Sequence, residues 1–332
     1  MTTEAEPGCP KRMVYGPCGG VRADLSCELG DRPCPFTTRP QLRWDGPPVA
    51  PAPVDVPLVL TDLTVRPYDP GSVRRVVKIL APVSDGLLVG EHHNRPDLPP
   101  TLFATEVLAA GGRPWTTLTC RDRNRIVLEQ ELVGLRALGV EGVLCVTGDA
   151  RGQGVRPDVT QVFDLDGTRL AALAASLGVP VAVPEAPDAP PVALRPDRVA
   201  QKQRAGAALC VLNHVGTPER VGRFVAAARA AGATLPFVAA VAVYTDAESA
   251  RVLQRFPGLA IDPAAVAAVL ASPDPFAAGV DAAVVEAEAL LAIPGVAGVN
   301  LSGLGRSGGE EAAAEAKAAI AVQIRQRVGV AS

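Results

Sequence analysis

The sequence predicts a closed (β/α)8 TIM barrel that is preceded by a small four-cysteine module. From residue 58 onward, eight short apolar runs alternate with segments whose apolar residues recur at helical spacing. The length of 332 residues suits a barrel of roughly 250 residues with a small appendage. No G-x-G-x-x-G motif follows the first apolar run, which disfavours an open dinucleotide-binding sheet.

The composition argues against two classes of protein. A net charge of −3 argues against a nucleic-acid-binding protein, which normally carries a basic face. No apolar run approaches the roughly 20 residues that span a bilayer, and the amino terminus lacks the layout of a signal peptide. We therefore expect a cytoplasmic protein that binds neither nucleic acid nor a membrane, and a homo-oligomer is compatible with these features.

The barrel is assigned to residues 58–332, and its elements follow one another with few breaks. Strands are expected at 58–63, 86–90, 115–120, 142–147, 179–183, 208–212, 237–243 and 298–301. Helices are expected at 71–80, 102–110, 125–138, 168–177, 196–205, 218–231, 247–256, 263–270, 276–291 and 310–327.

Four of the seven cysteines lie in the first 34 residues. Cys9, Cys18, Cys27 and Cys34 follow the spacing C-x8-C-x8-C-x6-C in a glycine-rich stretch. In a reducing compartment such a cluster predicts a metal site, with either zinc or an iron–sulfur centre such as a 4Fe-4S cluster. A loose tail with incidental thiols is the alternative. We assign residues 1–38 to a metal-binding module.

Residues 39–57 are rich in proline and show no periodic apolar pattern, which predicts an extended linker. The other three cysteines, Cys120, Cys145 and Cys210, stand alone at apparent strand positions and are expected in the core.

The stretch from residue 116 to 149 forms one strand–helix–strand unit. A charged turn, RDRNR, joins the β-prone run TTLTC to a helix in which leucines recur at helical spacing. Both strands end in polar residues, and α/β folds place their chemistry at the carboxyl ends of parallel strands. The candidates at strand ends are Asp62, Glu91, His92, His93, Thr119, Cys120, Arg121, Asp122, Thr147, Gly148, Asp149, Glu185, Asn213, His214, Tyr244 and Asn300.

The same stretch resembles the methylenetetrahydrofolate reductase family. LTCRDRNR, the TGD that ends the next strand, and VFDLDG at 162–167 carry the likeness. The pattern CPK…YGPCGG resembles a cysteine module that is fused to some of these reductases or carried by a partner subunit that supplies electrons. The resemblance implies a reduced folate (a tetrahydrofolate derivative) as substrate, flavin (FAD or FMN) as cofactor, and a nicotinamide or a redox partner protein as electron donor.

The resemblance implies a role for the end of the third strand. Asp122, together with Thr119 and Cys120, would lie beside the pterin and the cofactor ring. The alternative is that Asp122 caps the helix that begins near residue 125.

The resemblance also implies cofactor contacts on later strands. Asp149, with Thr147 and Gly148, would lie near the ribityl chain of a flavin, and an ordinary strand-end turn is the alternative. Lys202 matches a family lysine just before the sixth strand, and a solvated helix lysine is its alternative.

The first strand departs from the family pattern. Family members carry a glutamate there as proton donor, whereas this chain has Asp62, whose reach is shorter by about 1.5 Å. Glu91, His92 and Glu185 are the other candidate acids, and Glu185 is also a candidate cofactor contact. His92 and His93 are alternatively an exposed loop pair or metal ligands with Glu91.

The sixth strand departs as well. The family's Thr–Gln, whose glutamine holds the pterin, is replaced by Leu212-Asn213-His214, in which Asn213 could make a shortened version of the same contact.

Two hypotheses follow for function. The first is an oxidoreductase that resembles methylenetetrahydrofolate reductase and acts on the one-carbon unit of a reduced folate. The second, favoured by the altered first and sixth strands, is a noncatalytic or redox-independent protein that binds folate or transfers one-carbon units.

Overall fold

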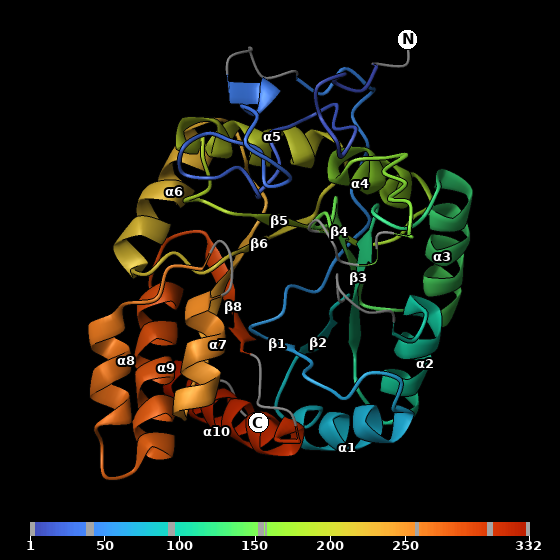
Figure 1. Cartoon of the computed structure of the whole chain (residues 1–332). Helices are drawn as coiled ribbons and strands as arrows, with labels where there is room; N and C mark the ends of the chain where they lie inside the picture. The colour runs from blue at the N-terminus through green and yellow to red at the C-terminus, as the bar shows by residue number, and fades with distance from the viewer. Residues whose placement is uncertain are drawn as a thin grey trace.

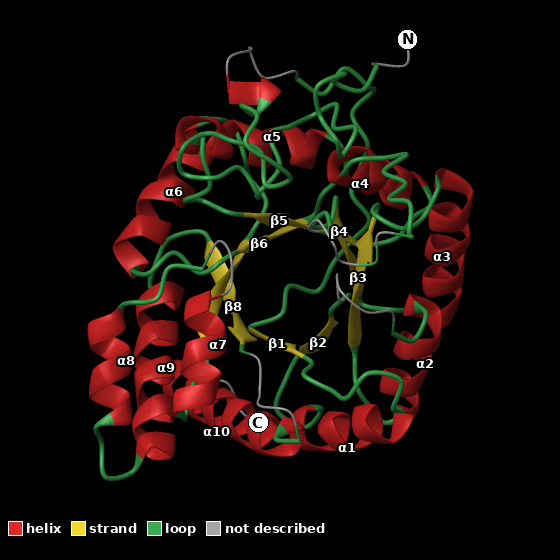
Figure 2. Cartoon of the chain, viewed as in Figure 1, coloured by secondary structure: helices red, strands yellow, loops and turns green. Residues whose placement is uncertain are grey.

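The computed structural model describes residues 4–37, 43–91, 97–151, 156, 158–255, 259–303 and 308–329. In this part of the chain, parallel strands close into a barrel in their sequence order, β1 to β8 (Figure 1). Figure 2 shows the strands as a central ring with the helices outside it. The predicted (β/α)8 architecture is therefore confirmed.

The strands lie close to their predicted positions. They are β1 Val59–Asp62, β2 Gly86–Val89, β3 Pro114–Thr119, β4 Gly142–Val146, β5 Val181–Glu185, β6 Leu209–Leu212, β7 Phe237–Ala242 and β8 Val296–Ser302. The expected bounds of the fifth strand, 179–183, are wrong by two residues at each end, because β5 starts at Val181 and ends at Glu185.

All the predicted helices are present. They are α1 Pro70–Leu80, α2 Pro100–Ala109, α3 Arg125–Leu138, α4 Gly167–Ser176, α5 Arg195–Arg204, α6 Pro218–Ala230, α7 Ala247–Arg255, α8 Pro263–Leu270, α9 Pro275–Leu291 and α10 Glu310–Val328. Local chemistry fixes where several helices begin. Proline suits the first helical position because the N–H that it lacks would have no partner there, and a preceding Asp or Asn side chain accepts hydrogen bonds from the free backbone amides of the first turn. The side-chain caps are Asp69, Asn124, Asp166, Asp262 and Asp274.

The barrel has two separate apolar layers. The inner layer contains only strand residues, among them Leu60, Trp115 and Leu209, together with Val54 from the segment before β1. The outer layer packs alternate strand residues against the helices. Trp115 fills the interior so closely that a Cβ built on Gly86 or Gly142 would come within 2.5 Å of its ring.

The segment before β1 follows the barrel. The Val49 amide donates to the Arg204 carbonyl at the end of α5 (3.1 Å), and Val54 packs into the inner layer. Because Val54 precedes β1, it enters the barrel from its amino end.

The described residues 4–37, which contain the four cysteines, lie over α4 and α5 (Figure 1, top). The amides of Val14 and Tyr15 both donate to Oδ2 of Asp166 (2.9 and 2.8 Å). Oδ1 of the same carboxylate caps α4 by accepting from the Arg169 amide (3.0 Å). One fully buried aspartate therefore holds both the module and a barrel helix.

Candidate functional site

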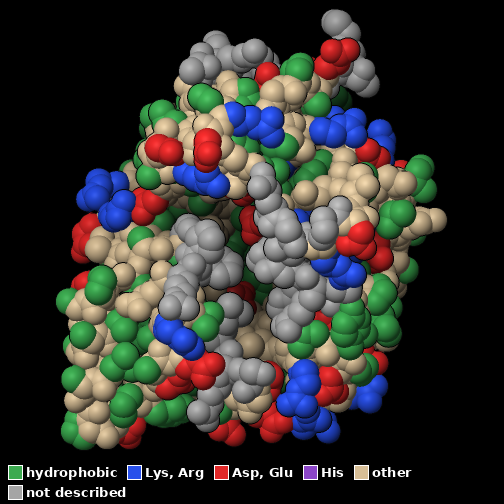
Figure 3. Space-filling view, viewed as in Figure 1, with side chains coloured by type: hydrophobic (Ala, Val, Ile, Leu, Met, Phe, Trp, Pro, Cys, Tyr) green, Lys and Arg blue, Asp and Glu red, His purple; other side chains and the backbone are tan. Residues whose placement is uncertain are grey.

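The carboxyl ends of the strands form one mouth, which faces the viewer in Figure 1. Figure 3 shows this face hollowed near its centre. Successive residues of a strand face opposite sides of the sheet. A predicted site residue therefore faces the barrel interior if it lies an even number of positions from a residue of the inner apolar layer on the same strand. Asp62 lies two residues after Leu60, Asn213 two after Val211, and Thr119 four after Trp115; all three face the interior.

The side chains of three other candidates face the opposite side of their strands, toward the helices. Cys120, Glu185 and His214 each follow by two residues an outer-layer residue, Leu118, Val183 or Leu212, and so face the helices. All three are buried, and burial raises the pKa of the Cys120 thiol well above its usual value. As predicted, Cys120, Cys145 and Cys210 belong to the core.

Asp62 is bound by two donors from β8. Its Oδ1 accepts from Asn300 Nδ2 (2.9 Å), and its Oδ2 accepts from the Ser302 hydroxyl (2.7 Å). Both oxygens of this candidate acid are therefore engaged. The other atom of the amide, Asn300 Oδ1, is buried and has no hydrogen-bond partner among the described residues.

The buried Lys317 of α10 holds β1 and β8 together behind this pair. Its ammonium donates to the carbonyls of Asp62 (2.7 Å) and Gly303 (3.0 Å). Burial lowers the pKa of Lys317 to about 8, although the nearby Asp62 opposes the shift.

Glu91 connects β2 to β3. Its carboxylate accepts from the Thr119 hydroxyl (2.8 Å) and from Arg123 Nη1 (2.9 Å). Its neighbours His92 and His93 lie outside the described residues.

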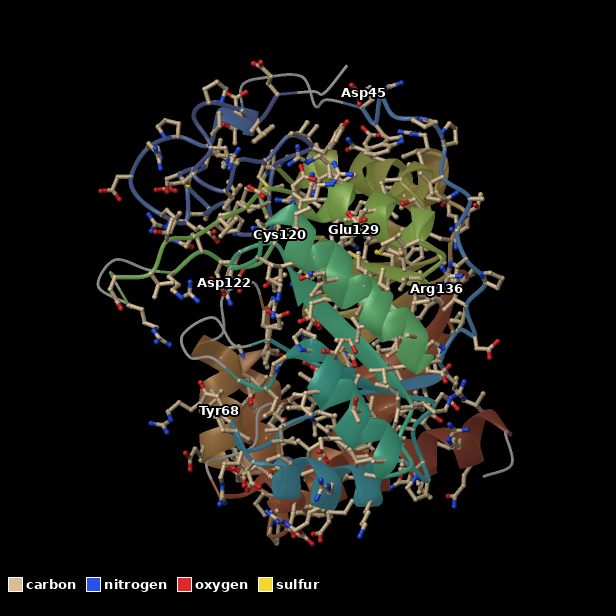
Figure 4. The ribbon with its side chains drawn as sticks, turned by 90° about the vertical axis from the view of Figure 1, so that its right-hand side faces the viewer. Asp45, Tyr68, Cys120, Asp122, Glu129 and Arg136 are labelled. Carbon is tan, nitrogen blue, oxygen red and sulfur yellow. The ribbon has the colours of Figure 1, made fainter. Side chains whose placement is uncertain are left out.

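Asp122 stands at the mouth in an arginine clamp. Arg151 binds it through two bonds (2.6 and 2.9 Å), and Arg121 Nε adds a third (2.9 Å). Burial opposes ionisation, but the two arginines outweigh it and lower the pKa of the carboxyl. The capping alternative is wrong, because Asn124 caps α3. Figure 4 shows Asp122 beyond the start of α3, on the side of the mouth.

The turn after β4 touches the cysteine module. Gly148, at φ +91°, accepts through its carbonyl a hydrogen bond from Lys11 (2.8 Å), which also pairs with Glu28 of the module. The Thr147 hydroxyl accepts from an amide at the start of α4. Asp149 is exposed, and its carboxylate has no hydrogen-bond partner in the described part of the chain.

Glu185 lies in a buried ion cluster between β5 and α5. Its carboxylate, 2% exposed, meets Lys202 at 2.8 Å, Arg195 at 3.3 Å and Arg198 at 3.6 Å. Burial opposes ionisation, yet the three cations hold the pKa of Glu185 at about 2. Lys202 is not the solvated lysine of the alternative interpretation, since it is itself buried. The group carries an excess of two positive charges.

The same cations reach the cysteine module. Arg195 donates to the Cys18 carbonyl (2.9 Å), and Arg198 donates to the Tyr15 carbonyl. In this structure Arg195 and Arg198 thus hold the module on the barrel, whereas Glu185 and Lys202 pair with each other in the buried cluster and do not face the mouth.

The two sequence neighbours after β6 differ. The Asn213 side chain faces the interior and makes no hydrogen bond to described residues. His214 bonds Glu286 (2.6 Å) and the Ala260 carbonyl (2.7 Å). Burial opposes protonation of His214, but Glu286 outweighs it and raises its pKa.

The four cysteines of the module line one small cavity of about 20 Å³, beside Lys11 and Glu28. Burial raises the pKa of Cys9 to about 11, and the adjacent Cys18 and Cys34 thiols add to the rise. Within the described residues, no group of three or more His, Cys, Asp or Glu side chains has the arrangement of a formed metal site. The thiols are gathered but are not in ligand geometry.

Comparison with known proteins decides the family. The model for methylenetetrahydrofolate reductase matches residues 113–309, from β3 to the start of α10. The chain belongs to the methylenetetrahydrofolate reductase family. The match covers LTCRD, TGD and VFDLDG and confirms the resemblance seen in the sequence. The first strand, β1, which departs from the family's sequence pattern, lies outside the matched residues.

One solved structure supports the fold. A protein from Clostridium thermocellum, described as uncharacterized and as binding two copies of 5-methyl-5,6,7,8-tetrahydrofolic acid, superposes with a TM-score of 0.59. It is 12% identical, and the alignment covers 81% of this chain and 95% of that one. A 2,3-dimethylmalate lyase follows with a TM-score of 0.45, 13% identity and 85% of each chain covered.

A comparison with curated protein sequences found no match. None of the helices in the described part of the chain is long and apolar enough to cross a bilayer.

Several features of the site were not predicted from the sequence. Arg151 and Ser302 lack any local signal, because their partners are distant in the sequence: Asp122 in the loop after β3, and Asp62 on β1. Asp166 of VFDLDG carried a detectable signal, since an aspartate before a helix predicts a cap. Its second role, holding Val14 and Tyr15, has no sequence signature.

Proposed function

We propose that the mouth of the barrel binds a reduced folate, and that this chain is an oxidoreductase like methylenetetrahydrofolate reductase that acts on its one-carbon unit. The observation that carries the proposal is the position of Asp122, which lies at the mouth in the family's LTCRD motif. Asp122 does not cap α3, because Asn124 is the cap. Its carboxylate offers about four lone-pair sites, so three arginine bonds leave room for a pterin N–H.

The affinity for folate tests this proposal. Asp122→Asn is expected to weaken binding of 5-methyltetrahydrofolate by about 10–100-fold, because it removes a charged acceptor worth about 1.5–3 kcal/mol. Isothermal titration calorimetry measures the change, with circular dichroism as the check on folding. Glu141→Gln is the matched control, since Glu141 also pairs with an arginine, Arg113 (2.7 Å), but precedes β4 at the amino end of the barrel. Equal affinities for wild type and Asp122→Asn would reject the proposal.

A flavin or a nicotinamide would supply the hydride when bound. We propose the turn formed by Thr147, Gly148 and Asp149 as its contact, because the Asp149 carboxylate is exposed and free to accept from hydroxyl groups.

A redox-independent folate-binding protein is the second candidate. It is favoured because the described acids near the mouth are already engaged in hydrogen bonds within the protein. Asp62 accepts hydrogen bonds from Asn300 and Ser302, and Glu91 accepts them from Thr119 and Arg123. An assay for methyltetrahydrofolate oxidation, with flavin and several electron acceptors supplied, separates the two. Binding without turnover would favour the second candidate.

We further propose that Cys9, Cys18, Cys27 and Cys34 hold one metal centre, either zinc or a 4Fe-4S cluster. The proposal is supported by their common cavity and by charge. Four thiolates around a divalent ion carry two net negative charges, and the adjacent cluster of Glu185 carries an excess of two positive ones.

Metal analysis tests the centre. Purified protein is expected to contain zinc, or iron with sulfide and a brown colour, and Cys18→Ala is expected to lose most of it because a closed site needs every ligand. Cys145→Ala, which removes a core thiol on β4, is the matched control and should retain the metal. Equal metal content in the two variants would contradict the assignment.

A further inference from the structure

The most informative polar atom outside the proposed contacts is Oδ1 of Asn300 on β8. Asn300 is 4% exposed, and this oxygen has no hydrogen-bond partner among the described residues. A buried acceptor without a partner is costly, so native proteins rarely leave one unless a ligand or a water completes it.

The orientation of the amide is fixed by its neighbour. Nδ2 of Asn300 donates to Asp62 (2.9 Å), whose carboxylate can only accept. The reverse orientation would place two acceptors against each other. Ser302 binds the other oxygen of Asp62 (2.7 Å) and holds the carboxylate in place. Oδ1 is therefore presented as an acceptor in every favourable arrangement.

Among the described residues, none offers Oδ1 a donor. The sequence neighbours of Asn300, Val299 and Leu301, belong to the outer apolar layer, so the Asn300 side chain faces the barrel interior, where it bonds Asp62. On the neighbouring strand β7 its register partner is Ala240, followed on the same face by Ala242. The methyl groups of these two alanines supply no hydrogen bond. Asn213 directly follows β6, the strand beyond β7.

We infer that Asn300 is a ligand-reading residue whose Oδ1 accepts a ring N–H of the pterin and thereby selects reduced over oxidised folate. The inference rests on the proposed function. In tetrahydrofolate the ring nitrogens N5 and N8 both carry hydrogen and can donate, and N8 still carries it when a one-carbon unit occupies N5. In folic acid the same nitrogens are bare acceptors, and they would meet Oδ1 with no proton between them.

Asp62 takes a different role in this arrangement. It does not touch the ligand but acts through Asn300, whose amide it orients, and it is a positioning residue. An aspartate suits this role because it accepts two donors from β8 over a short reach.

The test compares dissociation constants for tetrahydrofolate and folic acid, measured anaerobically by calorimetry. Wild type is expected to prefer tetrahydrofolate. Asn300→Ala is expected to weaken tetrahydrofolate binding by about tenfold and to leave folic acid binding unchanged, so that the ratio falls. Asp62→Asn is expected to lower the ratio part of the way, because an asparagine at this position accepts either orientation of the Asn300 amide. A general loss of structure would weaken both ligands and leave the ratio unchanged.

Gln203→Ala is the matched control, since Gln203 is an amide bonded at both ends to Thr234, away from the mouth. It should keep the wild-type ratio. If Asn300→Ala and Asp62→Asn both keep that ratio, or wild type binds both ligands equally, Asn300 does not read the pterin, although folate binding stands. If wild type binds neither ligand, the proposed function fails and this inference with it.

Discussion

Replacing Glu185 with glutamine is expected to lower the free energy of unfolding by about 3–5 kcal/mol. The carboxylate is the only anion that Arg195, Arg198 and Lys202 meet in the described part of this cluster. Burial already lowers the pKa of Lys202, so its charge is costly even with Glu185 present. Without the carboxylate, three cations would stay buried with only carbonyl oxygens as partners.

The same variant is expected to change the pH dependence of stability. The pKa of Glu185 is about 2 in the folded protein and ordinarily 4.5. Because the folded value is the lower one, the stabilisation is complete above pH 4.5 and is lost as the pH falls toward 2. Wild type should lose about 3 kcal/mol over that interval through this group, and Glu185→Gln should not.

Urea unfolding of both proteins between pH 7 and the lowest pH at which they fold measures the difference. Glu141→Gln is the control, since Glu141 makes a surface pair with Arg113 (2.7 Å) and should cost less than about 1 kcal/mol. Parallel curves for wild type and Glu185→Gln would show that Glu185 does not carry the buried charge.

Asp166→Ala is expected to destabilise the chain by about 3 kcal/mol or more and to loosen the cysteine module. It removes a charged acceptor from three backbone amides: those of Val14, Tyr15 and Arg169. Bonds to a charged group contribute about 1.5–3 kcal/mol each, and a cap contributes about 1 kcal/mol. Loosening is measured as faster reaction of Cys9 and Cys34 with a thiol reagent in metal-free protein.

Asp274→Ala separates capping from docking. Asp274 caps α9 through the Ala277 amide (3.0 Å) and is exposed, so its loss should cost about 1 kcal/mol and leave the thiols as slow as in wild type. If Asp166→Ala behaves like Asp274→Ala in both measurements, the module is held by other contacts.

The fold was predictable because its signals are local. Apolar runs with helical or strand spacing, prolines at helix starts and glycine at the end of α3 each act within a few residues, and all the strands and helices follow from them. The side of the barrel that each residue faces was harder to predict. Parallel strands are apolar on both faces, so Val183 and Glu185 show no alternation that assigns Glu185 to the helices.

Contacts between distant segments explain the other gaps. Asp62 meets Asn300 across 238 positions, and Val14 meets Asp166 across 152. No periodicity connects such positions. The LTCRD and TGD motifs were predicted at strand ends because a motif is local, whereas the arginine clamp on Asp122 closes across 29 positions.

Val54 gives the proline-rich segment before β1 a second structural role, in addition to linking the cysteine module to the barrel. Its side chain packs with Leu60 and Trp115 inside the amino end of the barrel, so this segment serves as a plug as well as a connection. A chain shortened to begin at residue 58 would keep every strand and helix of the barrel, yet water would gain access to its inner apolar layer from below. Trimming by composition alone would therefore remove a side chain that packs against the inner apolar layer of the barrel.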